Sequence, residues 1–110
     1  MGKIILNGEI EEFGDEVTKV KELFVSDVPD ISIAEVIRNS EDKSLECDKN
    51  SDNFYYVVEG RGFCLMGGKE NPISKGDLII IPKGTKYKNI GKVKLLAISL
   101  PKFKMENHDK

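Results

Sequence analysis

Imidazole chemistry is almost absent from this chain. Its single histidine, His108, is the third residue from the C-terminus. A general base or a late-metal site built on a buried imidazole is therefore nearly excluded. Cys64 as a nucleophile would need a lowered pKa and a neighbouring base. Without a histidine to act as that base, Cys64 is better explained as a small buried apolar residue.

Tyrosines and carboxylates are the remaining groups that could transfer protons. A tyrosine has an ordinary pKa of about 10, so it is a poor base at pH 7 unless a cation lowers that pKa. A partly buried carboxylate is a better base, and Glu46 and Asp48 are candidates. Both lie in the charged stretch 41–52, where acidic side chains are usually just solvated.

Composition narrows the class of protein. The 110 residues suffice for one domain, and 39% hydrophobic with 33% charged residues is ordinary for a globular chain. A net charge of -2 argues against a nucleic-acid partner. No apolar run approaches the roughly 20 residues that cross a bilayer, so no membrane partner is expected. Two cysteines make no disulfide framework, and the predicted location is the cytoplasm.

The elements that must position these groups are predicted to be short strands. Apolar and β-branched runs lie between glycine- or proline-containing turns, which is typical of an all-β sandwich or barrel. Residues 9–24 fit a helix or a strand, and we favour a strand at their end. The predicted strands are 31–36, 53–59, 63–66, 78–81 and 93–100, with turns at 60–62, 67–68 and 82–84.

Alternation along the strands predicts an apolar outer face. If Cys64 and Met66 point into a barrel, Phe63 and Leu65 point out, because side chains alternate with period 2. The run 78–81 leaves Leu78 and Ile80 outside in the same way. Residues 1–24 could cover this face, but a homodimer packed sheet against sheet is the preferred explanation.

Two blocks of the sequence resemble the motifs of the cupin superfamily. Six residues separate Asn53 from Gly60, as at the end of the first cupin motif, and fifteen residues separate Gly60 from the second. The second motif's scaffold is intact at Gly76, Pro82, Lys83, Gly84 and Tyr87. The resemblance implies a single-domain cupin jelly-roll β-barrel over residues 31–101. Residues 1–30 would add N-terminal strands or an arm packing on the barrel, and 102–110 a polar tail.

The same resemblance indicates that the family's metal site is lost. Metal-binding cupins use three histidines and one glutamate. Asn53 stands at the glutamate position and Tyr87 at the third histidine. Depending on spacing, the first two histidines align with Glu46 and Asp48 or with Cys47 and Lys49. No metal and no cofactor are therefore expected. Oxygen-only binding of Mg²⁺ or Ca²⁺ by Glu46, Asp48 and Asn53 is a weaker alternative.

The cupin template also implies which residues face the barrel mouth. Two phenols and an amide in an apolar barrel could bind a small polar molecule such as a sugar or an organic acid. Alternatively, Tyr55 is a core aromatic residue and Tyr87 only fills the place of a histidine. The candidate ligand-binding residues are Glu46, Asp48, Asn53, Tyr55, Met66 and Tyr87.

Three functions follow, and the sequence favours binding over catalysis. The preferred prediction is a non-metal, cytoplasmic cupin that binds a small polar ligand, as a sensor or accessory protein. A second is a metal-independent isomerase or lyase for a sugar or keto acid. It would use Glu46 or Asp48 as base and Tyr55 or Tyr87 as acid. A third is a structural or interaction module that docks through the outer sheet face carrying Phe63 and Leu65.

Overall fold

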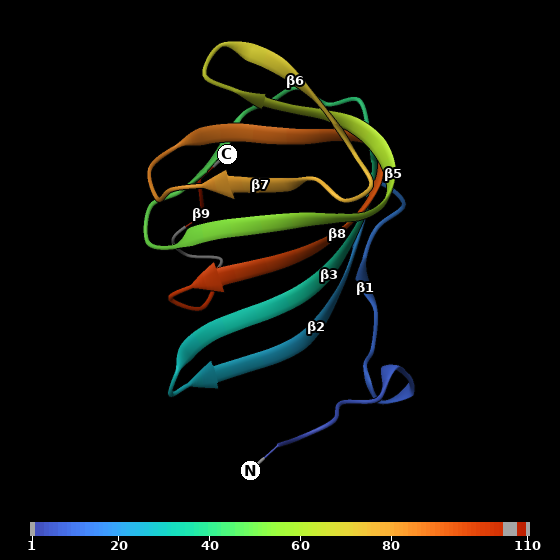
Figure 1. Cartoon of the computed structure of the whole chain (residues 1–110), viewed down its shortest axis with the longest axis vertical. Helices are drawn as coiled ribbons and strands as arrows, with labels where there is room; N and C mark the ends of the chain where they lie inside the picture. The colour runs from blue at the N-terminus through green and yellow to red at the C-terminus, as the bar shows by residue number, and fades with distance from the viewer. Residues whose placement is uncertain (1, 105–107, 110) are drawn as a thin grey trace.

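The chain folds into antiparallel strands that curl around one interior, as the computed structural model of residues 2–104 and 108–109 shows (Figure 1). This arrangement confirms the predicted all-β, single-domain jelly roll. A short 3-10 turn, η1 (Asn7–Glu9), precedes the strands. The strands are β1 (Phe13–Gly14), β2 (Thr18–Asp27), β3 (Asp30–Ser40), β4 (Glu46–Asp48), β5 (Asp52–Met66), β6 (Lys69–Ser74), β7 (Leu78–Ile81), β8 (Lys86–Leu100) and β9 (His108–Asp109).

Two long strands hold the barrel together. β5 and β8 contain 15 residues each and pair from Asp52↔Leu100 to Met66↔Tyr87. β3 pairs with the C-terminal part of β8, and β2 pairs with β3. β6 and β7 both pair with β5, at opposite ends of that strand. In Figure 1 the sheet therefore runs from β2 at the bottom to β6 at the top, with β5 and β8 between them.

The predicted turn at residues 60–62 is wrong, because β5 runs through it. Glycine at these positions allows the paired strands β5 and β8 to approach each other closely. A Cβ at Gly62 would lie 1.9 Å from the carbonyl oxygen of Ile90, and one at Gly91 would lie 2.7 Å from the Cα of Gly62. Any larger residue would force these strands apart, so glycine permits a continuous strand here.

Other local predictions are confirmed. Gly67 and Gly68, with φ of +63° and +73°, form the tight connection between β5 and β6. The run 78–81 is β7, and the end of the ambiguous stretch 9–24 is strand, since β2 begins at Thr18. The predicted strand 31–36 continues to Ser40, and the predicted strand 93–100 begins earlier, at Lys86. Each strand has a pairing partner over the added length.

Side-chain alternation is confirmed with one exception. Cys64 is buried and Met66 packs against the core, while Leu78 and Ile80 are 58% and 53% exposed. Leu65 was expected on an exposed outer face and is only 8% exposed. Its cross-strand partner Lys88 is 4% exposed, so this part of the outer side is closed to solvent within the single chain. Phe63 is 42% exposed, as expected.

The N-terminal segment adds to the barrel sheet. β2 pairs with β3 along most of its length, and β1 pairs with β2 at Phe13↔Val20. Both cysteines are free thiols, and burial raises the pKa of Cys64 to about 11. In the described part of the chain, no helix has the length and apolar character needed to cross a bilayer. The domain limits and the cytoplasmic location stay predictions.

Candidate functional site

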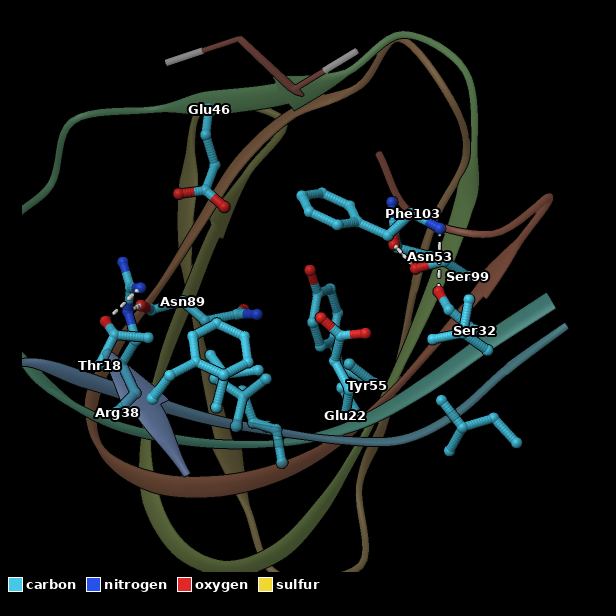
Figure 2. Close-up of a pocket in the computed structure, with 18 of the residues that line it drawn as sticks. Thr18, Glu22, Ser32, Arg38, Glu46, Asn53, Tyr55, Asn89, Ser99 and Phe103 are labelled. Atoms are coloured by element: carbon cyan, nitrogen blue, oxygen red, sulfur yellow. Dashed lines mark hydrogen bonds between the residues drawn. The ribbon is translucent and has the colours of Figure 1, made fainter. Parts of the chain in front are cut away.

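A cavity of about 540 Å³ lies inside the barrel (Figure 2). Apolar and polar side chains from several strands line it. In Figure 2 Arg38 and Thr18 lie at one end and Ser32, Ser99 and Phe103 at the other. The polar and charged lining residues are Asp15, Thr18, Glu22, Ser32, Arg38, Glu46, Asn53, Tyr55, Tyr87, Asn89 and Ser99. Apolar lining residues include Val20, Val36, Leu95 and Ala97.

A pair of tyrosines forms one wall of the cavity. Tyr55 on β5 and Tyr87 on β8 share a hydrogen bond of 2.6 Å between their hydroxyl oxygens, and their ring centroids are 5.8 Å apart. Burial raises the pKa of each phenol well above its usual value, and the carboxylates of Glu46 and Asp48 raise it further. Both tyrosines therefore keep their protons at neutral pH. They are hydrogen-bonding groups or proton donors, and they are not bases.

Asn53 belongs to a buried network in which each polar atom has a partner. Its Nδ2 donates to Asp48 Oδ2 at 3.2 Å, and its Oδ1 accepts from the Ser99 hydroxyl. Asp48 Oδ1 accepts from the backbone amides of Asn50 and Ser51, both at 2.9 Å. Such a satisfied network fixes the loop between β4 and β5 and orients the Asn53 side chain at the cavity wall.

Glu46 reaches the cavity from β4, paired with a buried lysine. Lys88 Nζ lies 3.1 Å from Glu46 Oε2, and the two side chains are only 5% and 14% exposed. The sequence left open whether Glu46 and Asp48 face solvent, and the structure answers this. Glu46 lines the cavity, whereas Asp48 lies behind Asn53, 2% exposed.

The six predicted ligand-binding residues thus separate into two groups. Four of them, Glu46, Asn53, Tyr55 and Tyr87, come together around the cavity. Asp48 supports one of these four through a hydrogen bond. Met66 packs against the apolar core and does not line the cavity.

Among the lining residues that the sequence analysis did not name, Arg38, Asn89 and Glu22 matter most. Arg38 donates from Nε to the carbonyl oxygen of Asn89 at 3.0 Å and from Nη1 to the Thr18 hydroxyl at 2.9 Å. Asn89 is 6% exposed, and among the described residues its Oδ1 has no hydrogen-bond partner. Glu22 extends into the middle of the cavity near Tyr55 (Figure 2).

A usable signal existed for two of these residues. Asn89 lies two positions after Tyr87, so strand alternation places it on the same face. Glu22 lies two positions after Val20 for the same reason, and both residues line the cavity. A register shift between Glu22 and Phe24 then breaks the alternation, so Phe24 does not line the cavity. For Arg38 the signal is long-range, because its two anchors come from other strands.

Segments near the two chain ends complete the rim. Phe13 from β1 and Phe103 after β8 both line the cavity. The Phe103 backbone amide donates to the Ser32 hydroxyl at 2.9 Å. The Lys102 amide donates to Asp30 Oδ1 at 3.0 Å. The start of the predicted tail is therefore hydrogen-bonded to β3.

These residues do not fit the metal site of metal-binding cupins. No group of three or more histidine, cysteine or acidic residues suited to a metal occurs in the part of the chain that the structure describes. The oxygen atoms at the motif positions already have protein partners: Asp48 bonds to Asn53, Glu46 to Lys88, and Tyr87 to Tyr55. The set contains no imidazole nitrogen, which late divalent metals prefer.

Fold and site together define a small antiparallel β-barrel with an internal polar cavity. The model of the family described as "Cupin domain" matches residues 36–99, and the chain belongs to this family. An uncharacterized protein of Methanocaldococcus jannaschii, MJ1618, is 39% identical over 61 residues, which is 52% of this chain and 49% of that protein. The matched segment thus spans about half the length of this curated relative.

Several solved structures share the fold. Pac13, described as a unique nucleoside dehydratase, superposes with a TM-score of 0.84 at 20% identity, covering 98% of this chain and 89% of that one. Structures of Streptomyces Pac13 variants contain uridine. KdgF from Halomonas superposes with a TM-score of 0.73 at 17% identity, covering 88% and 93%. Identities this low establish a shared fold alone.

Proposed function

We propose that this cupin binds a small polar molecule in its barrel cavity without a metal ion, as a sensor or accessory protein. The observation that carries the proposal is a cavity of about 540 Å³ on which hydrogen-bonding side chains of β2, β3, β5 and β8 converge. Ligand sites typically measure roughly 300–1,000 Å³ and combine apolar walls with a few polar groups. This cavity fits that description in size and lining.

The unfilled barrel favours binding over a purely structural role. An interaction module that docks through its outer face has no need for an internal cavity, and its own side chains would fill the barrel. Here Tyr87 leaves space beside Asn89 and Arg38 instead. Uridine in structures of Pac13 variants supports a ligand of nucleoside or sugar size.

A metal-independent isomerase or lyase is the second candidate, supported by the tyrosine pair. The two phenols retain their protons at neutral pH and can donate hydrogen bonds to a substrate oxygen, whereas their raised pKa values make them weak general acids. Glu22 or Glu46 at the same cavity would accept a proton from carbon. Substrate turnover in the absence of added metal would favour this candidate over simple binding.

The first experiment combines native mass spectrometry with elemental analysis. The protein is purified without a histidine tag and screened for thermal shifts against sugars, nucleosides and organic acids. The proposal expects a substoichiometric metal content and at least one compound that binds and raises the unfolding temperature. A stoichiometric transition metal, or a complete lack of binding, would overturn it.

We also propose that two copies pair through the outer face of the barrel. Leu78 lies beside Tyr56 and Ile80 beside Phe54 in the register of β7 and β5, so these apolar side chains share one face. Leu78, Ile80 and Tyr56 are 58%, 53% and 45% exposed. Exposed apolar patches of this kind commonly mark protein interfaces.

Light scattering during size-exclusion chromatography tests this pairing. The wild-type chain is expected to have the mass of a dimer, and the double variant Leu78→Lys/Ile80→Lys that of a monomer. Val28→Lys serves as the matched control, because Val28 is 90% exposed in the turn between β2 and β3. A monomeric wild type, or a dimeric double variant, would contradict the pairing.

A further inference from the structure

We propose that the cavity takes a small organic cation, an amine or a quaternary ammonium compound, whose charged nitrogen pairs with the Glu22 carboxylate. The inference rests on the proposed binding function and names the chemical class of the ligand. It assigns recognition to Glu22 and to the aromatic side chains of Phe13, Tyr55 and Phe103.

The first argument is the charge of the cavity lining. Three carboxylates line the cavity, those of Asp15, Glu22 and Glu46. Two cations lie beside them, Arg38 in the lining and Lys88 next to Glu46. Three negative charges against two positive charges leave one negative charge, which attracts a cation and repels an anion.

Glu22 is the carboxylate whose charge stays unbalanced. Glu46 pairs with Lys88 at 3.1 Å. Asp15 accepts hydrogen bonds from two backbone amides, which lower its pKa, and Arg38 lowers that pKa further. With the residues that the structure describes, Glu22 makes no hydrogen bond and no ion pair. A cation that enters the cavity therefore finds its counter-ion at Glu22.

Glu22 also lies where a bound molecule can reach it. Its cross-strand partner is Ala34 on β3, and the neighbouring inward-facing pair is Val20 and Val36. Glu22 is exposed, and its carboxylate points into the cavity in Figure 2. Its small, apolar neighbours leave room beside the carboxylate and supply no cation of their own.

The second argument is the aromatic part of the lining. Phe13, Tyr55 and Phe103 line the same cavity as Glu22. Phe13 and Phe103 are 52% and 38% exposed, so a ligand can contact their rings. In Figure 2 the Phe103 ring and the Glu22 carboxylate extend into the cavity from different sides. Aromatic rings attract cations to their faces, and groups of such rings bind ammonium ligands in other proteins.

Arg38 holds the cavity wall and lies apart from Glu22. It donates to the backbone oxygen of Asn89 at 3.0 Å and to the Thr18 hydroxyl at 2.9 Å, so it ties β8 to β2. In Figure 2 Arg38 lies beside Thr18 at one end of the cavity, whereas Glu22 lies in the middle. Arg38 therefore orders the strand that carries Glu22 and leaves the cation site open.

Isothermal titration calorimetry with matched compounds tests the charge class. One set is choline and its uncharged isostere 3,3-dimethyl-1-butanol. The other set is 5-amino-1-pentanol, 1,5-pentanediol and 5-hydroxypentanoate, which are cationic, uncharged and anionic. In at least one set we expect the cation to bind roughly tenfold more tightly than its uncharged counterpart. Binding of an uncharged or anionic member at least as tight as that of the cation, in both sets, would overturn the inference.

The series also distinguishes the inference from the function on which it rests. If none of the five compounds binds at millimolar concentration, the inference fails. If a compound of the thermal-shift screen still binds in that case, the proposed function survives. If no compound binds in either experiment, both fail.

The variant Glu22→Gln tests the assignment of the carboxylate. We expect affinity for the better cation to fall roughly tenfold and the preference over its uncharged counterpart to disappear. The unfolding temperature should stay close to that of the wild type, because Glu22 has no bond to lose among the described residues.

The matched control is Glu59→Gln on β5. Glu59 is exposed and lies outside the cavity lining, so this variant removes the same charge at a distance from the ligand. It should keep the affinity of the wild type. Unchanged affinity in Glu22→Gln, or an equal loss in Glu59→Gln, would overturn the assignment.

The variant Phe13→Leu tests the aromatic contribution. It keeps an apolar side chain at the rim and removes the ring, so affinity for the cation should fall roughly threefold. Phe63→Leu is the control, because Phe63 is similarly exposed, at 42%, and lies outside the cavity lining. Equal affinities in both variants would overturn the role given to Phe13.

Discussion

Asn53 and Asn89 are both inward-facing asparagines on the two long strands, yet their surroundings differ. Asn53 is 3% exposed and bonded through both amide atoms, to Asp48 and to Ser99. Asn89 is 6% exposed, and its Oδ1 is unbonded among the described residues. Burial is nearly equal, so the two amides differ in the completeness of their hydrogen bonding and not in their exposure.

The difference extends to the neighbouring charges. Asp48 beside Asn53 is enclosed by backbone amides, so its charge serves the loop between β4 and β5. Arg38 beside Asn89 is anchored by two acceptors and still lines the cavity. The side of the cavity around Asn53 is therefore fully hydrogen-bonded within the protein, and we call it the scaffold side. The side around Asn89 and Arg38 has polar groups available to a ligand, and we call it the ligand side.

Asp48→Ala should have the largest effect on the scaffold side. It removes the acceptor of two backbone amides and of Asn53 Nδ2, and leaves these donors buried. We expect the free energy of unfolding to fall by about 3 kcal/mol, measured by urea denaturation. The exposed Asp42→Ala is the control and should change it by less than about 1 kcal/mol. A loss below about 1 kcal/mol in Asp48→Ala would show that the network is not structural.

The tyrosine pair between the two sides should make the protein sensitive to alkaline pH. Unfolded tyrosines ionise near pH 10, whereas the folded pKa values of Tyr55 and Tyr87 are raised by burial. The stabilising contribution is therefore complete below pH 10 and is lost as pH rises. At pH 11 the loss is about 1 kcal/mol for each tyrosine.

Unfolding temperatures between pH 8 and 11.5 test this dependence. Tyr55→Phe and Tyr87→Phe should each flatten the decline above pH 10, and Tyr56→Phe, which removes an exposed hydroxyl, is the control. The buried Cys64, with a pKa of about 11, adds a decline that is present in all three variants. An unchanged slope in both cavity variants would show that these phenols ionise as freely as exposed ones.

Arg38→Met should produce a smaller loss on the ligand side. The variant removes two hydrogen bonds, to Asn89 O and Thr18 Oγ1, at a half-buried position. We expect about 1 kcal/mol of lost stability together with weaker binding of a cavity ligand. Arg61→Met on the exposed part of β5 is the control, with neither change. If Arg38→Met matched Asp48→Ala in stability, the distinction between the two sides would fail.

Much of the barrel could be predicted from local sequence. The strand 78–81 and the connection at Gly67–Gly68 depend on residue types next to one another, and both predictions hold. The turn predicted at residues 60–62 is wrong, because glycine occurs both in turns and where two paired strands approach closely. Local sequence does not reveal that the strand containing Ile90 and Gly91 pairs with these residues.

The lining of the cavity was predicted only where a motif pointed to it, although strand alternation offered a signal for Asn89 and Glu22. Asn53 and Tyr87 stand at the motif positions of the family, and Tyr55 follows by alternation, so these residues were found. Glu22 lies on β2 and Arg38 on β3, and long-range pairing sets the register of these strands relative to β8. The bonding state of Asn89 depends on the same pairing, so no sequence pattern distinguishes it from Asn53.

The most direct test compares Asn53→Leu with Asn89→Leu by urea denaturation of the ligand-free protein. Both variants replace a buried asparagine by leucine in a strand, so the effects of side-chain size and of strand propensity on stability largely cancel in the comparison. We predict that Asn53→Leu lowers the free energy of unfolding by about 2–3 kcal/mol, because Asp48 Oδ2 and the Ser99 hydroxyl lose their bonds to the Asn53 amide. Asn89→Leu should raise it by up to about 1 kcal/mol. Losses of similar size in both variants would contradict the claim that the Asn53 amide holds the structure together and the Asn89 amide does not.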